Sequence, residues 1–583
     1  MQWPRPPAEV LPLLTTLSPL IGVATTIAMS RWNASLVRSM ALSNSAMTLM
    51  LVIAAVGMQH ASESRDSGRY RTGRADSGIA WLAERSPEQQ AEDKVPAQGI
   101  RVRLAFDNDG LSAWPALLLS LTVWTGLCCP GRWDGASISF HCIWLMTSQA
   151  LLLASCFATD VIVAIVFLEI ALVPIYLLIG VHGEDGRRPV AGAWWIWQMI
   201  GCSCSLVGVT LLAVALPWMQ ADLVPARGAA VFDSSLLADS LRQLLARSAT
   251  AWHLWSHLAP WAAALMLLGL LIRLPLFPFL GWYQSTLVAA PSSVSAVIAV
   301  AFPLAALGGW LRLGLPLFGD DSGVVTGILA TASLIGLLQS GCAIQSQVDL
   351  KQILATLSSA MLCLAGIGLS FHNRDGILGA WLLVLSQGLA VAGGMLLVQI
   401  LESRCGTRDL SRLAELTKES PRLKGALTVL MLGWGGIPVV SGFSAVYLMF
   451  GASSGASLWL ILGVSVGIVS IATAAIRNFA RMTIQSTSST TSRAALAPVS
   501  TTSTLDTIQP ASSKRSTAGI RTDLSGSELA ALAPMLALWL MLNLAPMFAL
   551  KSCESTLLRL LHRSEHRTVG TMEAPPPRLV PGV

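Results

Sequence analysis

The sequence predicts an all-α polytopic membrane protein with about fourteen transmembrane helices, on the evidence of its composition and its apolar runs. Of its 583 residues, 53% are hydrophobic and only 12% are charged, whereas a soluble domain averages about 25% charged residues. The apolar runs are about twenty residues long, which is enough to cross a hydrocarbon core of ~30 Å as a helix. They are continuous rather than alternating, which argues against the strands of a β-barrel.

The expected spans follow one another from one end of the chain to the other. They lie near residues 10–29, 39–57, 111–129, 138–158, 161–181, 191–217, 257–280, 293–317, 324–344, 353–370, 376–401, 425–450, 456–476 and 528–550. The chain is therefore divided into N-terminal helices 1 and 2 (1–57), a polar loop insertion (58–108), a core of helices 3–13 (109–480), a Ser/Thr-rich loop (481–524), helix 14 (525–551) and a polar tail (552–583).

Polar composition marks the segments outside the membrane. Residues 58–108 and 481–524 are polar and contain no long apolar run, so we expect exposed loops there. Residues 218–256 include leucines at helical spacing, which indicate either an amphipathic surface helix or a linker. Ser525 and Glu528 have the spacing of a capping box, which predicts that the last transmembrane helix begins there.

Neither cysteines nor targeting signals indicate a further site. The ten cysteines are scattered, and no second pair follows at metal-ligand spacing, so we expect no metal site. The N-terminal stretch "MQWPRPPAEV" is neither a cleaved signal nor an amphipathic transit peptide, so we expect the first helix to remain in the mature protein.

Two ionisable residues lie well inside apolar spans. Glu169 lies in "VFLEIALVPIYLLIG", and Arg273 lies in "LLIRLPLFPFLGW". An ionisable side chain at mid-membrane costs about 2.5–3.5 kcal/mol on insertion scales, so it needs a partner or a role. Asp160 and Asp349 lie near the ends of spans, where water reaches them more easily. Glu169 and Arg273 are therefore the first candidates for function.

Two spans carry residues that break helices. Pro275 and Pro278 follow Arg273, and Gly436 and Pro438 lie in the later stretch "GWGGIPVVSGFSA". Proline removes an amide donor and clashes with the preceding turn, and broken helices in membranes occur where they line protein or water. Two breaks at corresponding positions indicate two repeats, as in ion-handling transporters. Simple kinking of two helices is the alternative.

Several segments, in order and spacing, resemble chain 4 of respiratory NADH:ubiquinone oxidoreductase (complex I), whose bacterial counterpart is the M subunit. These segments are "FDNDGLSAWPALLLSLT", "FATDVIVAIVFLEIALVPIYLLIG", "IRLPLFPFLGW" followed by "AAP", "QVDLKQILA" and "DLSGSELAALAPMLALWLMLNLAP". The resemblance extends from about residue 105 to 550, and the motif around Glu169 is its most specific part. The polar insertions are not covered.

The resemblance implies an antiporter-like core of two inverted five-helix repeats, helices 4–8 and 9–13, with helices 7 and 12 broken. It implies a membrane-arm subunit of a proton-translocating NADH dehydrogenase, placed beside two other antiporter-like subunits, with membrane lipids such as cardiolipin and no nucleic acid as partners. No cofactor is expected on this chain, because NADH, flavin, iron–sulfur clusters and ubiquinone belong to other subunits. The implied location is the mitochondrial inner membrane, with a bacterial plasma membrane as the alternative.

Carried over residue by residue, the resemblance makes Glu169 and Arg273 the central charged pair. The positions at which the family places its other titratable groups carry none here. These positions are Leu304, Met361, Gln387 and Val446, in place of a lysine, two histidines and an acid. An arginine stays protonated and cannot hand on its proton as a lysine can. The departures therefore point to an interrupted proton path.

Three functions remain in view. The first is a complex I subunit that pumps protons, and the second is a complex I subunit whose own channel is interrupted. The third is a free-standing cation/proton antiporter of the same fold, which needs titratable central groups at least as much as complex I does. The sequence favours the second.

Overall fold

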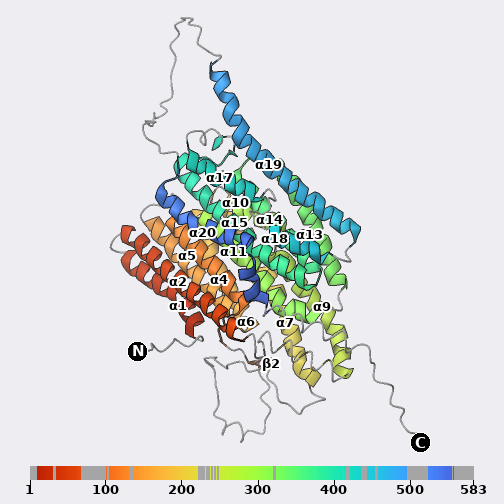
Figure 1. The fold of residues 1–583 in the computed structure, drawn as a ribbon. Helices are drawn as coiled ribbons and strands as arrows, with labels where there is room; N and C mark the ends of the chain where they lie inside the picture. Colours follow the sequence, from red (N-terminus) through yellow and green to blue (C-terminus); the bar gives the residue numbers. More distant parts are fainter. Residues whose placement is uncertain are drawn as a thin grey trace, which may run out of the picture.

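The structure is a computed structural model. It describes residues 10–30, 34–66, 100–101, 104–129, 136–184, 186–220, 230–231, 249–318, 323–410, 412–413, 420–434, 443–453, 457–494 and 523–554, with Leu237, Leu241, Leu245 and Thr556. Nearly all of them are helical, and the helices pack side by side into one bundle (Figure 1).

The elements follow one another in this order: α1 (Val10–Ser30), α2 (Ala34–Asp66), β1 (Ile100–Arg101), α4 (Gly110–Cys128), α5 (Ala136–Phe157), α6 (Val161–His182), α7 (Arg187–Gln220), β2 (Ala230–Val231), α9 (Ala249–Arg273), α10 (Leu280–Ala289), α11 (Ser292–Gly309), the π-helix η1 (Trp310–Gly314), α12 (Leu315–Phe318), α13 (Gly323–Ala343), α14 (Leu350–Ser370), α15 (Arg374–Cys405), α17 (Pro421–Trp434), α18 (Phe443–Ala452), α19 (Leu458–Ala494) and α20 (Gly526–Leu544). The two short strands pair in parallel.

The expected fold class is confirmed. Thirteen of the described helices are long and apolar enough to cross a membrane. The remaining expected span, 425–450, corresponds to α17 and α18, which flank residues 435–442. The second predicted break, with Gly436 and Pro438, lies in that interval, outside the described residues.

The order of the spans gives two groups of five. The helices α5, α6, α7, α9 with α10, and α11 form the first group; α13, α14, α15, α17 with α18, and α19 form the second. Successive spans cross the bilayer in opposite directions, and five is odd. Corresponding members of the two groups therefore run in opposite directions, as inverted repeats do.

Two helices continue beyond the ends that the apolar runs predict. We expected spans to end near residues 57 and 476, but α2 continues to Asp66 and α19 to Ala494. Neither continuation contains proline or glycine, so no residue there stops the helix. Part of each expected polar loop is therefore helix, and α19 extends past the bundle (Figure 1). Most of both loops lies outside the described residues.

Short polar residues begin several helices. The carboxylate of Asp160 accepts hydrogen bonds from the amides of Ile162 and Val163 at 2.9 and 3.3 Å, and thereby caps α6. Asp349 caps α14 in the same way. The capping box of Ser525 and Glu528 is present as predicted. These acids stabilise helix ends and do not lie at mid-membrane.

The centre of the bundle is formed by α11, α14 and α15. Nearly every residue of these three helices is buried, whereas α1, α2, α13 and α19 expose apolar side chains on their outer faces. A helix that is apolar all round is a buried one. The predicted proton path therefore runs through the part of the fold from which neighbouring helices exclude lipid.

Candidate functional site

The first candidate element is an interrupted helix. The helix α9 ends at Arg273, and α10 begins only at Leu280. Between them, the amide of Leu276 donates to the carbonyl of Leu271 at 2.9 Å, and the amide of Phe279 donates to the carbonyl of Leu276 at 2.6 Å. Pro275 and Pro278 have no amide to donate, so the regular ladder cannot continue. The interruption places Arg273 at a helix end inside the bundle.

The guanidinium of Arg273 is buried, and one part of it has no partner. Only 6% of the residue is exposed. Its stem packs against Gly201 of α7, where an added Cβ would come within 2.8 Å of Arg273 Cγ. Its Nε and Nη2 atoms are buried without a hydrogen-bond acceptor in the part of the chain that the structure describes. Buried donors of a charged group are costly unless something accepts from them.

Glu169 lies near Arg273 but not in contact with it. It is partly exposed on α6, next to the outward-facing Ile170. The charges of Glu169 and Arg273 act on each other and on the buried thiol of Cys202. No ion pair within 4.0 Å joins Glu169 to Arg273 in the described structure. The two candidates from the sequence are therefore neighbours whose charges interact at longer range.

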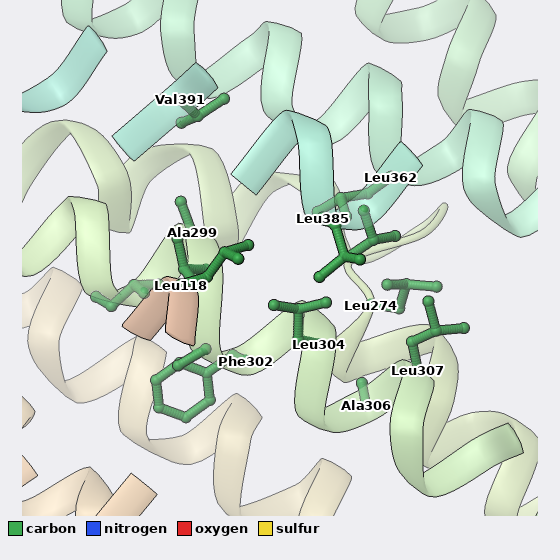
Figure 2. Packing of buried hydrophobic residues seen from close by; sticks show 14 of the residues in the cluster. Leu118, Leu274, Ala299, Phe302, Leu304, Ala306, Leu307, Leu362, Leu385 and Val391 are labelled. Carbon is green, nitrogen blue, oxygen red and sulfur yellow. The ribbon is translucent and has the colours of Figure 1, made fainter. Parts of the chain in front are cut away.

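Leu304 lies in an apolar part of the core. It is only 2% exposed, in α11. Figure 2 shows Leu304 within a group of apolar side chains that includes Leu274 from the interrupted helix, Leu307 and Leu385. At this position, where the resemblance places a lysine, the structure offers a proton neither an acceptor nor a polar neighbour among these side chains.

Gln387 belongs to a buried chain of uncharged polar groups. Ser358 of α14 donates to Gln387 Oε1 at 3.1 Å, and its hydroxyl lies 2.7 Å from that of Tyr283 in α10. Beside it, Gln284 donates to Ser359 at 2.6 Å. Hydroxyl and amide groups exchange hydrogen bonds but do not hold a charge near neutral pH.

The other two positions taken from the resemblance lie elsewhere. Met361 is partly exposed on α14. Val446, on α18, lines a small apolar hollow with Phe371 and Met449. Neither carries a group that accepts a proton.

A network of charges lies where α6, α10, α14 and α15 end or begin. Lys351 is fully buried, and its Nζ donates to Glu184 Oε1 at 2.7 Å and to the carbonyl of Ala290 at 2.6 Å. Arg408 also pairs with Glu184, and with Asp349 at 2.5 Å. Burial alone would lower the pKa of Arg408, but its contacts with Glu184 and Asp349 raise it. Arg408 therefore stays charged.

This network borders a polar hollow that reaches the interrupted helix. The hollow has a volume of about 850 Å³, and Glu184, Arg187, Gln284 and Arg408 line it. Gln284, which lines the hollow, donates to Ser359 in the core. Water can therefore approach the core along α10 from this end of the bundle.

Sequence reasoning missed several of these residues. Asp349 was placed near the end of a span and Lys351 appeared only within the segment "QVDLKQILA", and nothing in the sequence pointed to their partners Glu184 and Arg408. It also missed His141 and His182, whose rings lie 5.7 Å apart and whose Nε2 atoms lie 3.1 Å from the hydroxyl of Ser293 and 2.7 Å from that of Ser137. An ionisable residue within a span, the signal that identified Glu169, also applies to His141.

Metal-ligating residues do not gather anywhere in the described ranges. No group of three His, Cys, Asp or Glu residues there is placed to hold a metal ion. The arrangement places charged and polar side chains inside a bundle of apolar, membrane-spanning helices.

Known proteins share both the sequence pattern and the fold. Residues 158–472 match the family described as NADH:quinone oxidoreductase/Mrp antiporter, transmembrane. NADH-quinone oxidoreductase subunit 13 of Thermus thermophilus is 26% identical over 366 residues, 62% of this chain and 71% of that protein. NADH-ubiquinone oxidoreductase chain 4 of Prototheca wickerhamii is 24% identical over 436 residues, 74% of this chain and 77% of that protein.

Solved structures agree on the fold. A chain of respiratory complex I from Thermus thermophilus with bound NADH superimposes with a TM-score of 0.70 at 21% identity, covering 95% of this chain and 99% of that one. A chain of the Mrp complex from Dietzia superimposes with a TM-score of 0.64 at 19% identity, covering 94% of this chain and 52% of that one. Because the family pattern covers more than half of its residues, the protein belongs to the NADH:quinone oxidoreductase/Mrp antiporter transmembrane family.

Proposed function

We propose that this chain is an antiporter-like subunit in the membrane arm of a proton-translocating NADH:quinone oxidoreductase, and that its own proton path is interrupted at the centre. The observation that carries the proposal is Leu304, buried among apolar side chains beside the interrupted helix (Figure 2). A bare charge that crosses an apolar gap meets a barrier of several kcal/mol. Each ~1.4 kcal/mol of barrier slows transfer about tenfold.

Glu169 and Arg273 are the central charged pair in this proposal. An arginine cannot hand on its proton as a lysine can, so this pair does not relay a proton through Arg273. The polar chain of Tyr283, Ser358 and Gln387 offers hydrogen bonds in the core but no group that titrates near neutral pH. The subunit then contributes fold, assembly and a fixed field to the complex.

The remaining parts of the machinery belong to other subunits. NADH, flavin, iron–sulfur clusters and ubiquinone bind there, and two further antiporter-like subunits flank this one together with membrane lipids, including cardiolipin. The location that we propose is the mitochondrial inner membrane, because a mitochondrial-type chain 4 is among the relatives. A bacterial plasma membrane fits the bacterial relatives equally well.

A free-standing cation/proton antiporter is the second candidate. The Mrp structure of the same fold favours it. Its weakness is the same apolar centre, because an antiporter must load and release its ions within one subunit. Recovery of the native protein in a very large complex with NADH dehydrogenase activity supports the first proposal, and recovery as a small separate membrane species contradicts it.

Proton stoichiometry tests the interruption. The intact complex is reconstituted in proteoliposomes, and protons released per NADH are compared between the natural protein and Gln387→Leu. Gln399→Leu is the matched control, because Gln399 is another buried glutamine of α15. We expect the same stoichiometry in all three. A lower stoichiometry in Gln387→Leu alone, with electron transfer intact, would show that protons pass through this subunit.

A further inference from the structure

Two exposed histidines lie one helical turn apart on α9. His253 and His257 belong to the stretch "HLWSH", and both residues are exposed. Side chains at positions i and i+4 lie on the same face of a helix, one above the other. The centroids of the two imidazole rings are 4.8 Å apart, and the ring planes are inclined at 63°. The surface of α9 thus presents two imidazole groups side by side.

This separation suits two ligands of one metal ion. An imidazole nitrogen lies ~2.0–2.1 Å from the zinc ion that it binds, which places the centroids of two neighbouring rings on one ion about 4.5–5 Å apart. Two histidines at i and i+4 on one helix face are a recurring zinc-binding arrangement. We propose that His253 and His257 chelate a divalent transition-metal ion, with water completing its coordination.

The ligands indicate the class of metal. Imidazole suits copper, nickel and zinc, and the affinity of a given nitrogen site for these divalent ions is highest for Cu²⁺. We therefore expect Cu²⁺ to bind most tightly and Zn²⁺ less tightly. Mg²⁺ and Ca²⁺ are bound mainly by carboxylate and carbonyl oxygens, and the sequence of α9 contains no aspartate or glutamate.

The arrangement favours binding of a metal over hydrolysis by one. In the helical zinc motif of metalloproteases, a glutamate follows the first histidine and acts as general base. Leu254 stands at that position here and lines an apolar hollow between α7 and α9. No third His, Cys, Asp or Glu ligand joins the pair within the described ranges. The expectation of no metal site was drawn from the cysteines and does not apply to a pair of histidines.

The pair lies where dissolved ions reach the helix. Figure 1 shows α9 at one side of the bundle, and its apolar span begins at Trp252, which is 43% exposed. Tryptophan is enriched at the membrane–water interface, so His253 and His257 lie close to that interface. A lipid phosphate suits the pair poorly, because Arg273 at the opposite end is the only arginine or lysine of α9.

The edge-to-face contact of the two rings is the alternative explanation of the geometry. Aromatic pairs adopt such arrangements without any metal, and the experiment below distinguishes the two. The inference does not rest on the proposed function, because a metal ion can bind at the start of α9 whether or not the subunit conducts protons.

Copper binding to the purified assembly that contains this chain tests the inference. The assembly carries no oligohistidine tag. His562→Gln and His566→Gln form the background, because these residues have the same spacing and lie outside the described residues. His253→Gln and His257→Gln each remove one ligand, and Ser256→Ala, at an exposed residue between them, is the matched control. Equilibrium dialysis measures bound Cu²⁺, and electron paramagnetic resonance of the oxidised assembly reports its nitrogen ligands.

We expect the background protein and Ser256→Ala to bind one Cu²⁺ per chain through two nitrogen ligands. The affinity for Cu²⁺ should fall at least about tenfold in each histidine variant, since the loss of even an outer-shell partner of a metal ligand costs 10–100-fold. The signal from paired nitrogen ligands should disappear in both variants. Zn²⁺ should displace Cu²⁺ only when it is in excess.

Chemical modification keeps the test valid if a histidine variant fails to assemble. Diethyl pyrocarbonate modifies accessible imidazoles, and mass spectrometry of peptides reports each histidine separately. In the natural protein, Cu²⁺ should protect His253 and His257 over the same range of concentration. His372, a histidine of the connection between α14 and α15, should stay unprotected.

Three results would overturn the inference. Equal binding of Cu²⁺ in the background protein and both histidine variants would show that the rings are only a stacked pair. Weaker binding in just one variant would show that a single histidine binds the ion and that no chelate forms. Modification of His253 and His257 that Cu²⁺ does not slow would show that no ion binds there.

Discussion

The buried ammonium group of Lys351 lies 2.7 Å from the carboxylate of Glu184, across 167 residues of sequence, and also donates to the carbonyl of Ala290 at the end of α10. The amide of Glu184 in turn donates to the carbonyl of Ala289 at 2.8 Å. These contacts satisfy the last carbonyl groups of the half-helix, which have no partner within it. The pair therefore holds the interrupted helix against α6 and α14.

Lys351→Met should destabilise the subunit by about 3 kcal/mol. Removing one partner of a buried ion pair costs about 3–5 kcal/mol, and the lower end applies because Arg408 still neutralises Glu184. Lys424→Met, at an exposed lysine, is the control. Thermal unfolding and the yield of assembled complex measure the effect. Equal stability of the two variants would contradict the role of the pair.

Ser358→Ala should cost about 1–3 kcal/mol, the usual penalty for leaving a buried polar group unpaired. The hydroxyl of Tyr283 and Oε1 of Gln387 both lose their described partner when Ser358 is removed. Ser346→Ala is the control, because its hydroxyl is exposed and bonds only the local carbonyl of Ala343. Unfolding in denaturant compares the two variants, and a neutral Ser358→Ala would indicate that water replaces the hydroxyl.

Glu169→Gln should not destabilise the subunit, because an ionisable side chain within a membrane span is costly when it forms no ion pair, and the amide removes its charge. From the sequence alone we expected a close pair with Arg273 and hence a larger loss. The fraction of the variant that enters the complex distinguishes the two expectations, with Glu402→Gln as the comparison, because Glu402 forms an ion pair with Arg408 at 3.4 Å. Failure of Glu169→Gln to assemble would indicate a direct ion pair in the working complex.

The sequence predicts those features that depend on residues close to one another in the chain. Apolar runs specify the spans, Pro275 and Pro278 mark the interruption of α9, and Ser525 with Glu528 marks the start of α20. The spans within α2 and α19 end at Gln59 and Arg481, close to the predicted ends near 57 and 476. The continuation of both helices beyond the spans was not predicted, because hydropathy reports the membrane and not the helix.

Contacts between distant segments were not predictable from the sequence. The partners of Lys351 come from α15 and from the connection after α6, and only the packed bundle brings them together. The burial of the Arg273 guanidinium depends on how its stem packs against Gly201, which no periodicity encodes. The charges of Glu169 and Arg273 act on each other, but the distance that decides their interaction is a property of the packing.

Leu304→Lys should destabilise the subunit by about 2.5–3.5 kcal/mol, the cost of an ionisable side chain at mid-membrane, because its neighbours Leu274, Leu307 and Leu385 offer it no partner (Figure 2). Leu304→Met, which conserves volume, should cost less than about 1.5 kcal/mol. Unfolding of the assembled subunit measures both.

The same variant bears on proton transfer. A lysine at position 304 restores one titratable group, but an arginine at position 273 cannot hand on its proton and the amide of Gln387 does not titrate. We therefore expect Leu304→Lys to leave protons released per NADH unchanged in proteoliposomes, and Arg273→Lys combined with Leu304→Lys and Gln387→His to be the smallest change able to raise it. A rise in Leu304→Lys alone would mean that the leucine is the sole interruption, and that water already connects Arg273 and Gln387 to the two faces of the membrane.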